Sequence, residues 1–204
     1  MHEVVSLEIV VGISGASGVQ YGVRLLQVLK EKGCVTHLMV TDSARKIMRI
    51  ETDFLPEDVE KLASYVYSPD NFAAPVASGS HLFDAMAVIP CSMGTLSGIA
   101  SGSSDTLITR AADVSLKERR RLVLVPRETP LSLVQLRNMV AVAEAGAIIL
   151  PACPAFYSRP ESIAELVDVL VGRVLDLLGV ENDLYRRWKG NAYNRLNQSG
   201  GQVI

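Results

Sequence analysis

A glycine-rich loop near the N-terminus constrains the fold more than any other stretch of this sequence. The loop, GISGASG, runs from Gly12 to Gly18; it follows an apolar run that begins at Leu7 and precedes a helical pattern that begins near Val19. Strand, tight glycine loop and helix in this order open a parallel βαβ unit. The start of such a helix presents free N–H groups and a positive dipole to an anion. The loop is therefore predicted to bind a phosphate group.

The spacing of these glycines excludes the two standard phosphate fingerprints. The dinucleotide pattern needs Gly-x-Gly-x-x-Gly and the P-loop needs Gly-Lys-Ser/Thr, whereas this loop repeats glycine every third residue. Asp42 follows the second predicted strand, where a dehydrogenase places its ribose-binding acid. The glycine spacing weakens that interpretation, and a plain tight turn between strand and helix stays the alternative.

The rest of the chain alternates between the two kinds of element. Strands are predicted at 7–13, 35–41, 85–89, 122–125 and 147–150, and helices at 19–32, 43–50, 59–65, 107–121, 132–144 and 160–178. This alternation predicts an α/β fold, a three-layer doubly wound parallel sheet covered on both faces. We expect one domain over residues 1–190 and a flexible tail over 191–204.

Composition excludes several classes of function. The 204 residues are 49% hydrophobic and 21% charged, and the net charge of −2 predicts no binding of nucleic acid. The three cysteines and three histidines show no metal-ligand spacing, so no metal site is predicted. The first residues include Glu3 and Glu8 and no long apolar run, so we expect neither signal peptide nor membrane span, and a cytoplasmic protein.

Ligands of open parallel sheets bind at the carboxyl ends of the strands. The loops there are predicted to offer the hydroxyls of Thr41 and Ser92, the start of a helix at Thr95, and the cation Arg127. Such a set suits a phosphate attached to a planar heterocycle. For the loop at Ser92, ordinary turn chemistry is an equal alternative. Cys91 has no histidine nearby in sequence and is interpreted as a buried thiol rather than a nucleophile.

Further cations are candidates for a second anion pocket. Arg110, Lys117 and Arg127 would suit a phosphate monoester, which carries nearly two charges. From spacing alone, a solvated helix face for Lys117 and a surface pair for Glu128 are favoured instead.

Several blocks of the sequence together resemble the UbiX family of flavin prenyltransferases. The resemblance covers about residues 9–188. The blocks that carry it are Gly15–Gly18 with Tyr21–Leu26, Glu51–Asp53, Ser78–Ser80, Pro90–Leu96, Arg110–Val114 with Leu116–Arg120, Arg127–Pro130, Pro154–Tyr157 with Arg159-Pro160, and Arg187-Trp188.

The resemblance implies a flavodoxin-like, Rossmann-related fold and a homododecamer that binds FMN at subunit contacts. It implies transfer of a dimethylallyl group from dimethylallyl phosphate to N5 and then C6 of reduced FMN, without a metal. The product, prenylated FMN, would serve a UbiD-type decarboxylase. The resemblance does not choose between ubiquinone biosynthesis and aromatic acid metabolism.

By position, the resemblance also implies roles for individual residues. FMN would contact Gly15, Ala16, Ser17, Thr41, Ser92, Met93, Gly94, Thr95 and Arg127. The prenyl phosphate would be held by Lys117, Glu128, Tyr157 and Arg173, with Arg110 close by. Ser17 and Glu51 would assist proton transfer, so that Ser17, Glu51, Lys117 and Glu128 form the catalytic set.

This sequence departs from the family pattern at three positions. Thr41 replaces a usual serine and keeps the hydroxyl, Asp42 replaces a frequent lysine, and Ser158 replaces histidine or asparagine. Two other functions stay open at this point. One is a flavin-dependent decarboxylase of related fold, disfavoured because no early histidine matches. The other is a non-catalytic flavin-binding subunit of an aromatic acid decarboxylase.

Overall fold

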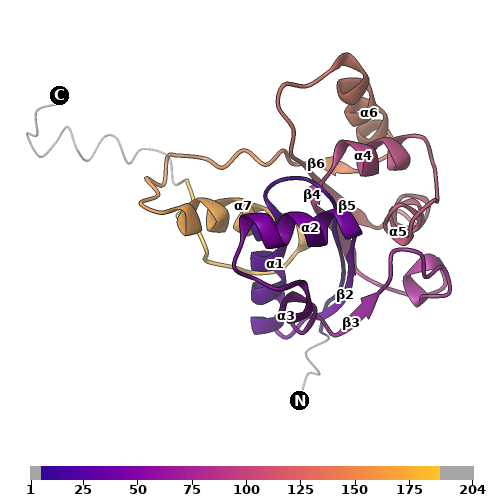
Figure 1. The fold of residues 1–204 in the computed structure, drawn as a ribbon, viewed down its shortest axis with the longest axis horizontal. Coiled ribbons are helices and arrows are strands. Elements are labelled where there is room, and N and C mark those ends of the chain that lie inside the picture. The colour runs from indigo at the N-terminus through magenta and orange to yellow at the C-terminus, as the bar shows by residue number, and fades with distance from the viewer. Residues whose placement is uncertain (1–5, 189–204) are drawn as a thin grey trace, which may run out of the picture.

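The computed structural model describes residues 6–188, which form a six-stranded, all-parallel sheet flanked by helices (Figure 1). The strand order is β3-β2-β1-β4-β5-β6. The strands are β1 Glu8–Ile13, β2 Val35–Val40, β3 Tyr65–Tyr67, β4 Ala85–Cys91, β5 Arg121–Pro126 and β6 Ile148–Ile149. The helices are α1 Val19–Glu31, α2 Asp42–Glu51, α3 Pro56–Glu60, α4 Met93–Ala100, α5 Leu107–Lys117, α6 Leu133–Glu144 and α7 Ile163–Leu178, with a 3-10 turn η1 at Pro75–Ala77.

Two separate hydrophobic cores hold the three layers together. On one face of the sheet, α1, α2 and α7 pack against side chains such as Ile9 and Val11 of β1. On the other face, α4, α5 and α6 pack against the alternate residues, among them Val10 of β1 and Met86 of β4. Because successive strand residues point to opposite faces, a strand buried on both sides is apolar throughout. The predicted doubly wound, three-layer fold is thus confirmed.

The strand order places a topological switch point between β1 and β4. From β1 the chain builds the sheet outward through β2 and β3, and then returns to add β4, β5 and β6 on the other side. The loops after β1 and β4 therefore leave the same edge of the sheet in opposite directions and open a crevice between them, which is where such folds bind ligands. The predicted phosphate loop, 12–18, borders this crevice.

Most predicted elements are confirmed to within two residues, and the exceptions have local causes. The predicted helix at 59–65 is wrong beyond α3, because Tyr65–Tyr67 forms the edge strand β3 and pairs with His37–Met39. Aromatic and β-branched residues favour a strand once such a partner is present. Pro90 does not end β4, because its carbonyl accepts a hydrogen bond from Ser14 N, 3.2 Å away.

Three other expectations concern the ends of elements or the chain. The predicted helix at 107–121 ends at Lys117, and Arg121 already begins β5. The predicted strand 147–150 contracts to β6. The predicted tail, 191–204, lies outside the described residues. Within 6–188, no helix is both long and apolar enough to cross a membrane.

Candidate functional site

Ser14 fastens the loop after β1 to the loop after β4. Its side chain is fully buried, and its Oγ donates a hydrogen bond to Pro90 O at 3.0 Å and accepts one from Ser92 N at 2.8 Å. Both sides of the switch-point crevice are therefore held in register by one hydroxyl group. Sequence reasoning placed Ser14 in the loop without giving it a role, because its partners lie far away along the chain.

Glu51, the last residue of α2, holds the C-terminal end of the glycine loop. One carboxylate oxygen accepts a hydrogen bond from Gly18 N at 2.8 Å. Gly18 itself adopts the left-handed conformation, with φ 98°. Gly15 packs so closely on α2 that a Cβ at this position would overlap the Cβ of Ser43. The structure thus brings the predicted residues Gly15, Ser17 and Glu51 to one loop.

Two helix N-termini meet this crevice. Thr41 caps α2, with its Oγ1 accepting from Ala44 N at 3.2 Å, and Ser92 caps α4, with its Oγ accepting from Thr95 N at 3.3 Å. The remaining first-turn N–H groups of such helices have no intrahelical partner. A Cβ added at Gly94, in the first turn of α4, would meet nothing within 4 Å. The crevice therefore has both the donors and the open space that a phosphate-bearing planar ligand needs.

Tyr21 lies beside the glycine loop, within the electrostatic influence of Arg127 after β5. A Cβ at Gly18 would lie 3.0 Å from the Tyr21 ring. The pKa of the Tyr21 phenol is raised by burial and by nearby Cys153, and the positive charge of Arg127 opposes this rise. These three side chains are therefore neighbours. Sequence reasoning did not assign Tyr21, although its place three residues after Gly18, on the first turn of α1, was the available signal.

An apolar pocket continues the carboxyl edge beyond β6. Its volume is about 600 Å³, and its lining includes Tyr157, Arg173 and Cys153. The Tyr157 ring packs edge-on against Trp188, with the ring centroids 5.6 Å apart. Arg173 lies 3.7 Å from Asp176 in an ion pair. Two of the predicted phosphate ligands, Tyr157 and Arg173, thus share one pocket.

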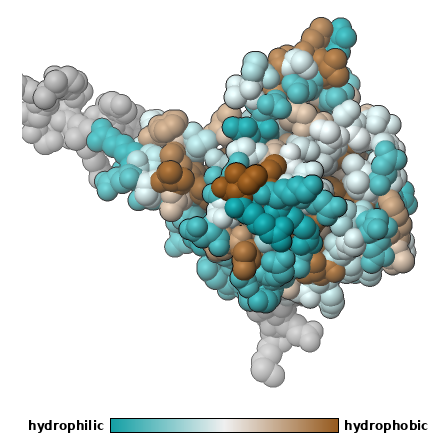
Figure 2. Space-filling model, viewed as in Figure 1, coloured by the Kyte–Doolittle hydropathy of each residue, from teal (hydrophilic) through white to brown (hydrophobic). Residues whose placement is uncertain are grey.

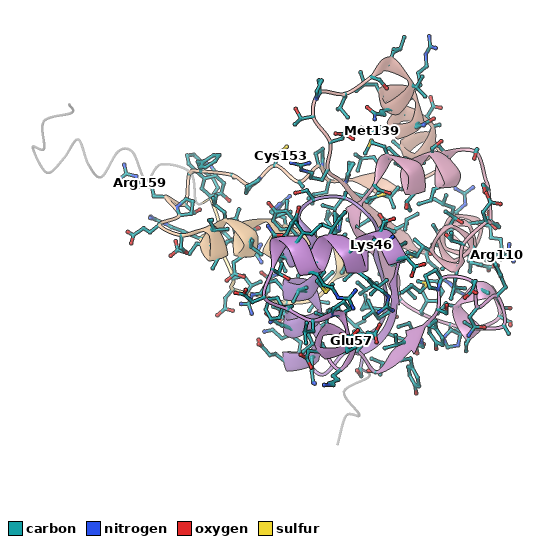
Figure 3. The ribbon with its side chains drawn as sticks, in the orientation of Figure 1. Lys46, Glu57, Arg110, Met139, Cys153 and Arg159 are labelled. Carbon is teal, nitrogen blue, oxygen red and sulfur yellow. The ribbon has the colours of Figure 1, made fainter. Side chains whose placement is uncertain are left out.

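The other two predicted cations lie elsewhere in the same chain. Arg110 projects from α5 on the side of the molecule away from Cys153 (Figure 3), donates to Ala77 O at 3.0 Å and pairs with Asp113 at 2.9 Å. Lys117 pairs with Glu118 at 2.7 Å, and a Cβ at Gly79 would lie 2.9 Å from its Nζ. Lys117 therefore lies beside the loop that leads into the start of β4.

Glu128 stands at the opposite end of the sheet from Lys117. Glu128 follows the carboxyl end of β5, where its Oε1 accepts from Thr129 N at 2.9 Å, whereas Lys117 precedes the start of β5. The six-residue strand between them is about 20 Å long. One chain therefore does not assemble the predicted anion pocket. Arg127, beside Glu128, has no carboxylate within ion-pair distance in the described part of the chain.

Cys91 is fully buried, and burial raises the pKa of its thiol to about 12, whereas Cys153 is exposed. Because the thiolate is the reactive form, its fraction at Cys91 is only about 10⁻⁴ at pH 8. In native protein treated with iodoacetamide, we expect peptide mapping to find Cys153 labelled and Cys91 labelled only after denaturation. A Cys153→Ser variant serves as the control. Labelling of native Cys91 at the rate of Cys153 would contradict the buried-thiol interpretation.

Comparison with known proteins places this geometry in a family. Residues 1–175 match the flavoprotein family. The flavin prenyltransferase UbiX of Thermoplasma acidophilum is 53% identical over 182 residues, which are 89% of this chain and 100% of that protein. The chain belongs to the UbiX-type flavoproteins. The family resemblance expected from the sequence motifs is thus confirmed.

Solved structures of this family share the fold closely. The structure of AnUbiX (PadA1) in complex with FMN and dimethylallyl pyrophosphate has a TM-score of 0.89 and 49% identity, covering 91% of this chain and 98% of that one. A dodecameric FMN-dependent UbiX-like decarboxylase from Escherichia coli O157:H7 has a TM-score of 0.88 and 46% identity, covering 90% of this chain and 100% of that one. The switch-point crevice therefore belongs to a fold known to hold FMN in a UbiX-type relative.

Proposed function

We propose that this chain is a flavin prenyltransferase, which joins the dimethylallyl group of dimethylallyl phosphate to N5 and C6 of reduced FMN. The observation that carries the proposal is the crevice between the loops after β1 and β4, fastened by Ser14 and Glu51 in a chain that is 53% identical to a flavin prenyltransferase. The prenylated FMN would serve a UbiD-type decarboxylase.

The crevice fits FMN as the acceptor. The open space at Gly94 lets the backbone approach a flat ligand, and the α4 N-terminus suits a phosphate. Reduced FMN supplies the electron-rich ring atoms that accept the prenyl group. The residues proposed to hold it are Gly15, Ala16, Ser17, Thr41, Ser92, Met93, Gly94, Thr95 and Arg127.

Departure of phosphate is the step that the charged residues assist. As the allylic C–O bond breaks, its electron pair leaves with the phosphate, and cations at the departing oxygens stabilise the growing negative charge. Arg173 and Tyr157 lie in a mainly apolar pocket, which limits the water that could intercept the allylic cation. Ser17, on the glycine loop, and Glu51, at the end of α2 and hydrogen-bonded to that loop, would transfer the protons.

We propose further that the anion site is completed by neighbouring copies of the chain. Lys117 lies at the opposite end of the sheet from Glu128, so another copy would supply Lys117 to each crevice. Exposed apolar residues gather on α6, which forms the outer tip of the molecule in Figure 2, with Leu133, Val134 and Val140 all more than half exposed. Such a patch is typical of a subunit contact, in keeping with a homododecamer.

Mixed oligomers test this arrangement. We expect Lys117→Ala and Arg173→Ala chains to be inactive alone. Denatured together in equal amounts and refolded, they should regain about a quarter of wild-type activity. If each site takes its Lys117 and its Arg173 from different chains, each residue is intact in half of the sites, and both are intact in about a quarter. Equal amounts of each variant refolded separately are the control. No recovery in a mixed assembly that forms normally would show that each site draws both residues from one chain.

The activity itself is tested by mass spectrometry. Incubation with reduced FMN and dimethylallyl phosphate should give a flavin heavier by one dimethylallyl group. Flavin binding without this product, even with a UbiD-type partner added, would overturn the proposal and favour a binding subunit. Carbon dioxide release from an aromatic acid by this chain alone would favour a decarboxylase, the name carried by the Escherichia coli relative. A cytoplasmic location is also proposed, since the three cysteines are free thiols.

A further inference from the structure

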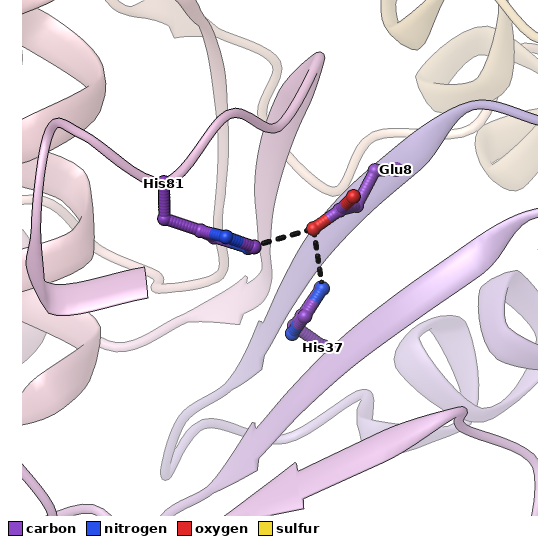
Figure 4. Close-up of side chains that lie close together, drawn as sticks. All are labelled: Glu8, His37 and His81. Carbon is purple, nitrogen blue, oxygen red and sulfur yellow. Dashed lines mark hydrogen bonds and ion pairs between the residues drawn. The ribbon is translucent and has the colours of Figure 1, made fainter. Parts of the chain in front are cut away.

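Three ionisable side chains converge at the amino end of the sheet, at the edge opposite the crevice. Glu8 begins β1, His37 lies in β2, and His81 lies in the loop before β4 (Figure 4). The Nε2 atoms of both histidines lie 2.7 Å from the same carboxylate oxygen of Glu8. All three candidate ligand atoms lie within 4.8 Å of one another. No step of the proposed function uses them.

We propose that Glu8, His37 and His81 form a binding site for a divalent transition metal of the zinc class. Two imidazole nitrogens and one carboxylate oxygen are ligands that Zn²⁺ takes at about 2.0–2.2 Å. Tetrahedral ligands at that distance lie about 3.3 Å apart, so each histidine nitrogen needs to move away from the Glu8 oxygen by only about half an ångström, and the two nitrogens already lie within 4.8 Å of each other. The fourth position is left for water. Because the three ligands come from separate segments, the metal would tie β1, β2 and the loop before β4 together.

The contact at His81 favours a shared ligand over a simple hydrogen bond. His81 Nε2 is shielded from solvent and has no hydrogen-bond partner among the described residues, although it lies at ion-pair distance from Glu8. The His81 nitrogen is close to the Glu8 carboxylate but lacks hydrogen-bond geometry. Two ligands of the same metal ion would have this arrangement.

Surrounding residues orient these ligands. The other ring nitrogen of His37, Nδ1, lies 2.9 Å from the Tyr67 hydroxyl, and burial raises the pKa of that phenol so that it stays neutral. With Nε2 on a metal, Nδ1 carries the hydrogen atom and the Nδ1–H group donates a hydrogen bond to the Tyr67 oxygen, the outer hydrogen bond usual for metal-binding histidines. Glu8 is held by its own N–H, which donates to Asp84 at 2.7 Å.

The site is also accessible from solvent, and charged side chains of both signs lie near it. The side chain of His37 is 3% exposed, whereas those of His81 and Glu8 are 29% and 27% exposed, which leaves an entry path from solvent. Arg120 donates to His81 O at 2.7 Å and brings a positive charge near the site. The two carboxylates of Glu8 and Asp84 outnumber this positive charge, which favours binding of a cation.

Zinc binding to the untagged full-length protein, stripped with a chelator, tests the site. Equilibrium dialysis with elemental analysis should find one Zn²⁺ per chain, and zinc-edge X-ray absorption should show nitrogen and oxygen ligands without sulfur. At about a hundred times the dissociation constant, Zn²⁺ should raise the melting temperature by about 5–10 °C. Glu8→Gln and His81→Ala should each weaken binding by at least about tenfold.

His2→Ala is the matched control, because His2 is the one histidine of the three that is not a proposed ligand, and it lies outside the described residues. It should leave zinc affinity unchanged. Loss of binding in His2→Ala, equal binding in Glu8→Gln and His81→Ala, or less than one ion per wild-type chain would overturn the proposal. His37 is left intact, because its ring stacks on Tyr65 with centroids 4.9 Å apart and its loss would disturb the core. If Glu8→Gln does not fold, the zinc affinity of His81→Ala tests the site, because the His81 side chain is partly exposed.

Discussion

Glu51→Gln should lower the prenyl-transfer rate by about a hundredfold while leaving FMN affinity within about threefold of wild type. The reason is that the observed hydrogen bond of Glu51 and its proposed proton transfer can be separated by substitution. Its carboxylate accepts the hydrogen bond from Gly18 N at 2.8 Å, and a glutamine oxygen can accept the same bond. Glutamine cannot take up and release a proton, so only the proposed proton transfer is lost. Single-turnover mass spectrometry with reduced FMN measures the rate, and flavin fluorescence measures the affinity.

Glu51→Ala is the matched comparison for this experiment. It removes the acceptor as well, so the glycine loop loses its closing contact, and FMN affinity should fall together with the rate. The stability cost of the lost bond should be about 1 kcal/mol, measured by denaturant unfolding. Wild-type turnover in Glu51→Gln combined with loss in Glu51→Ala would show that Glu51 only positions the loop.

The sequence predicted the fold well because periodicity and glycine placement are local signals. The helices at 19–32, 43–50 and 132–144 have amphipathic patterns and clear start or stop residues, and their observed bounds differ by at most two residues. The predicted helix at 59–65 includes Tyr65, and the strand Tyr65–Tyr67 is not predicted, because its pairing with β2 is a long-range event. A three-residue edge strand carries too little pattern to be recognised without its partner.

The part of the candidate site formed by loops at the carboxyl ends of strands was predictable from the sequence. The part that depends on contacts between residues far apart in the chain was not. The loops at 14–18 and 92–95 follow from the rule for parallel sheets. Ser14 is hydrogen-bonded to Pro90, and Tyr21 lies within the electrostatic influence of Arg127, and no local pattern connects either pair. The sequence shows His37 and His81 as scattered, because the pairing of β1 with β2 brings His37 to Glu8 and the loop before β4 brings His81 there.

Gly15→Ala should destabilise the protein by about 1–3 kcal/mol and weaken FMN binding by at least about tenfold. The new methyl group would overlap the Cβ of Ser43 in α2, so either the glycine loop or α2 must move. Gly15 is not among the residues with positive φ, so the effect comes from packing rather than from backbone strain. Denaturant unfolding with and without FMN measures both parts of the loss.

The double variant Gly15→Ala, Ser43→Gly separates this cause from any other. Removing the Ser43 side chain removes the atom with which the new methyl group collides, and the next contact, with the Ser43 carbonyl carbon at 3.6 Å, is ordinary. Glycine at position 43 costs up to about 1 kcal/mol of helix stability, which the single variant Ser43→Gly measures. After that correction, the double variant should recover most of the stability and FMN affinity. If the stability and the FMN affinity of the double variant both stay low, the collision with α2 is not the cause, and Gly15 is required for direct approach of the flavin.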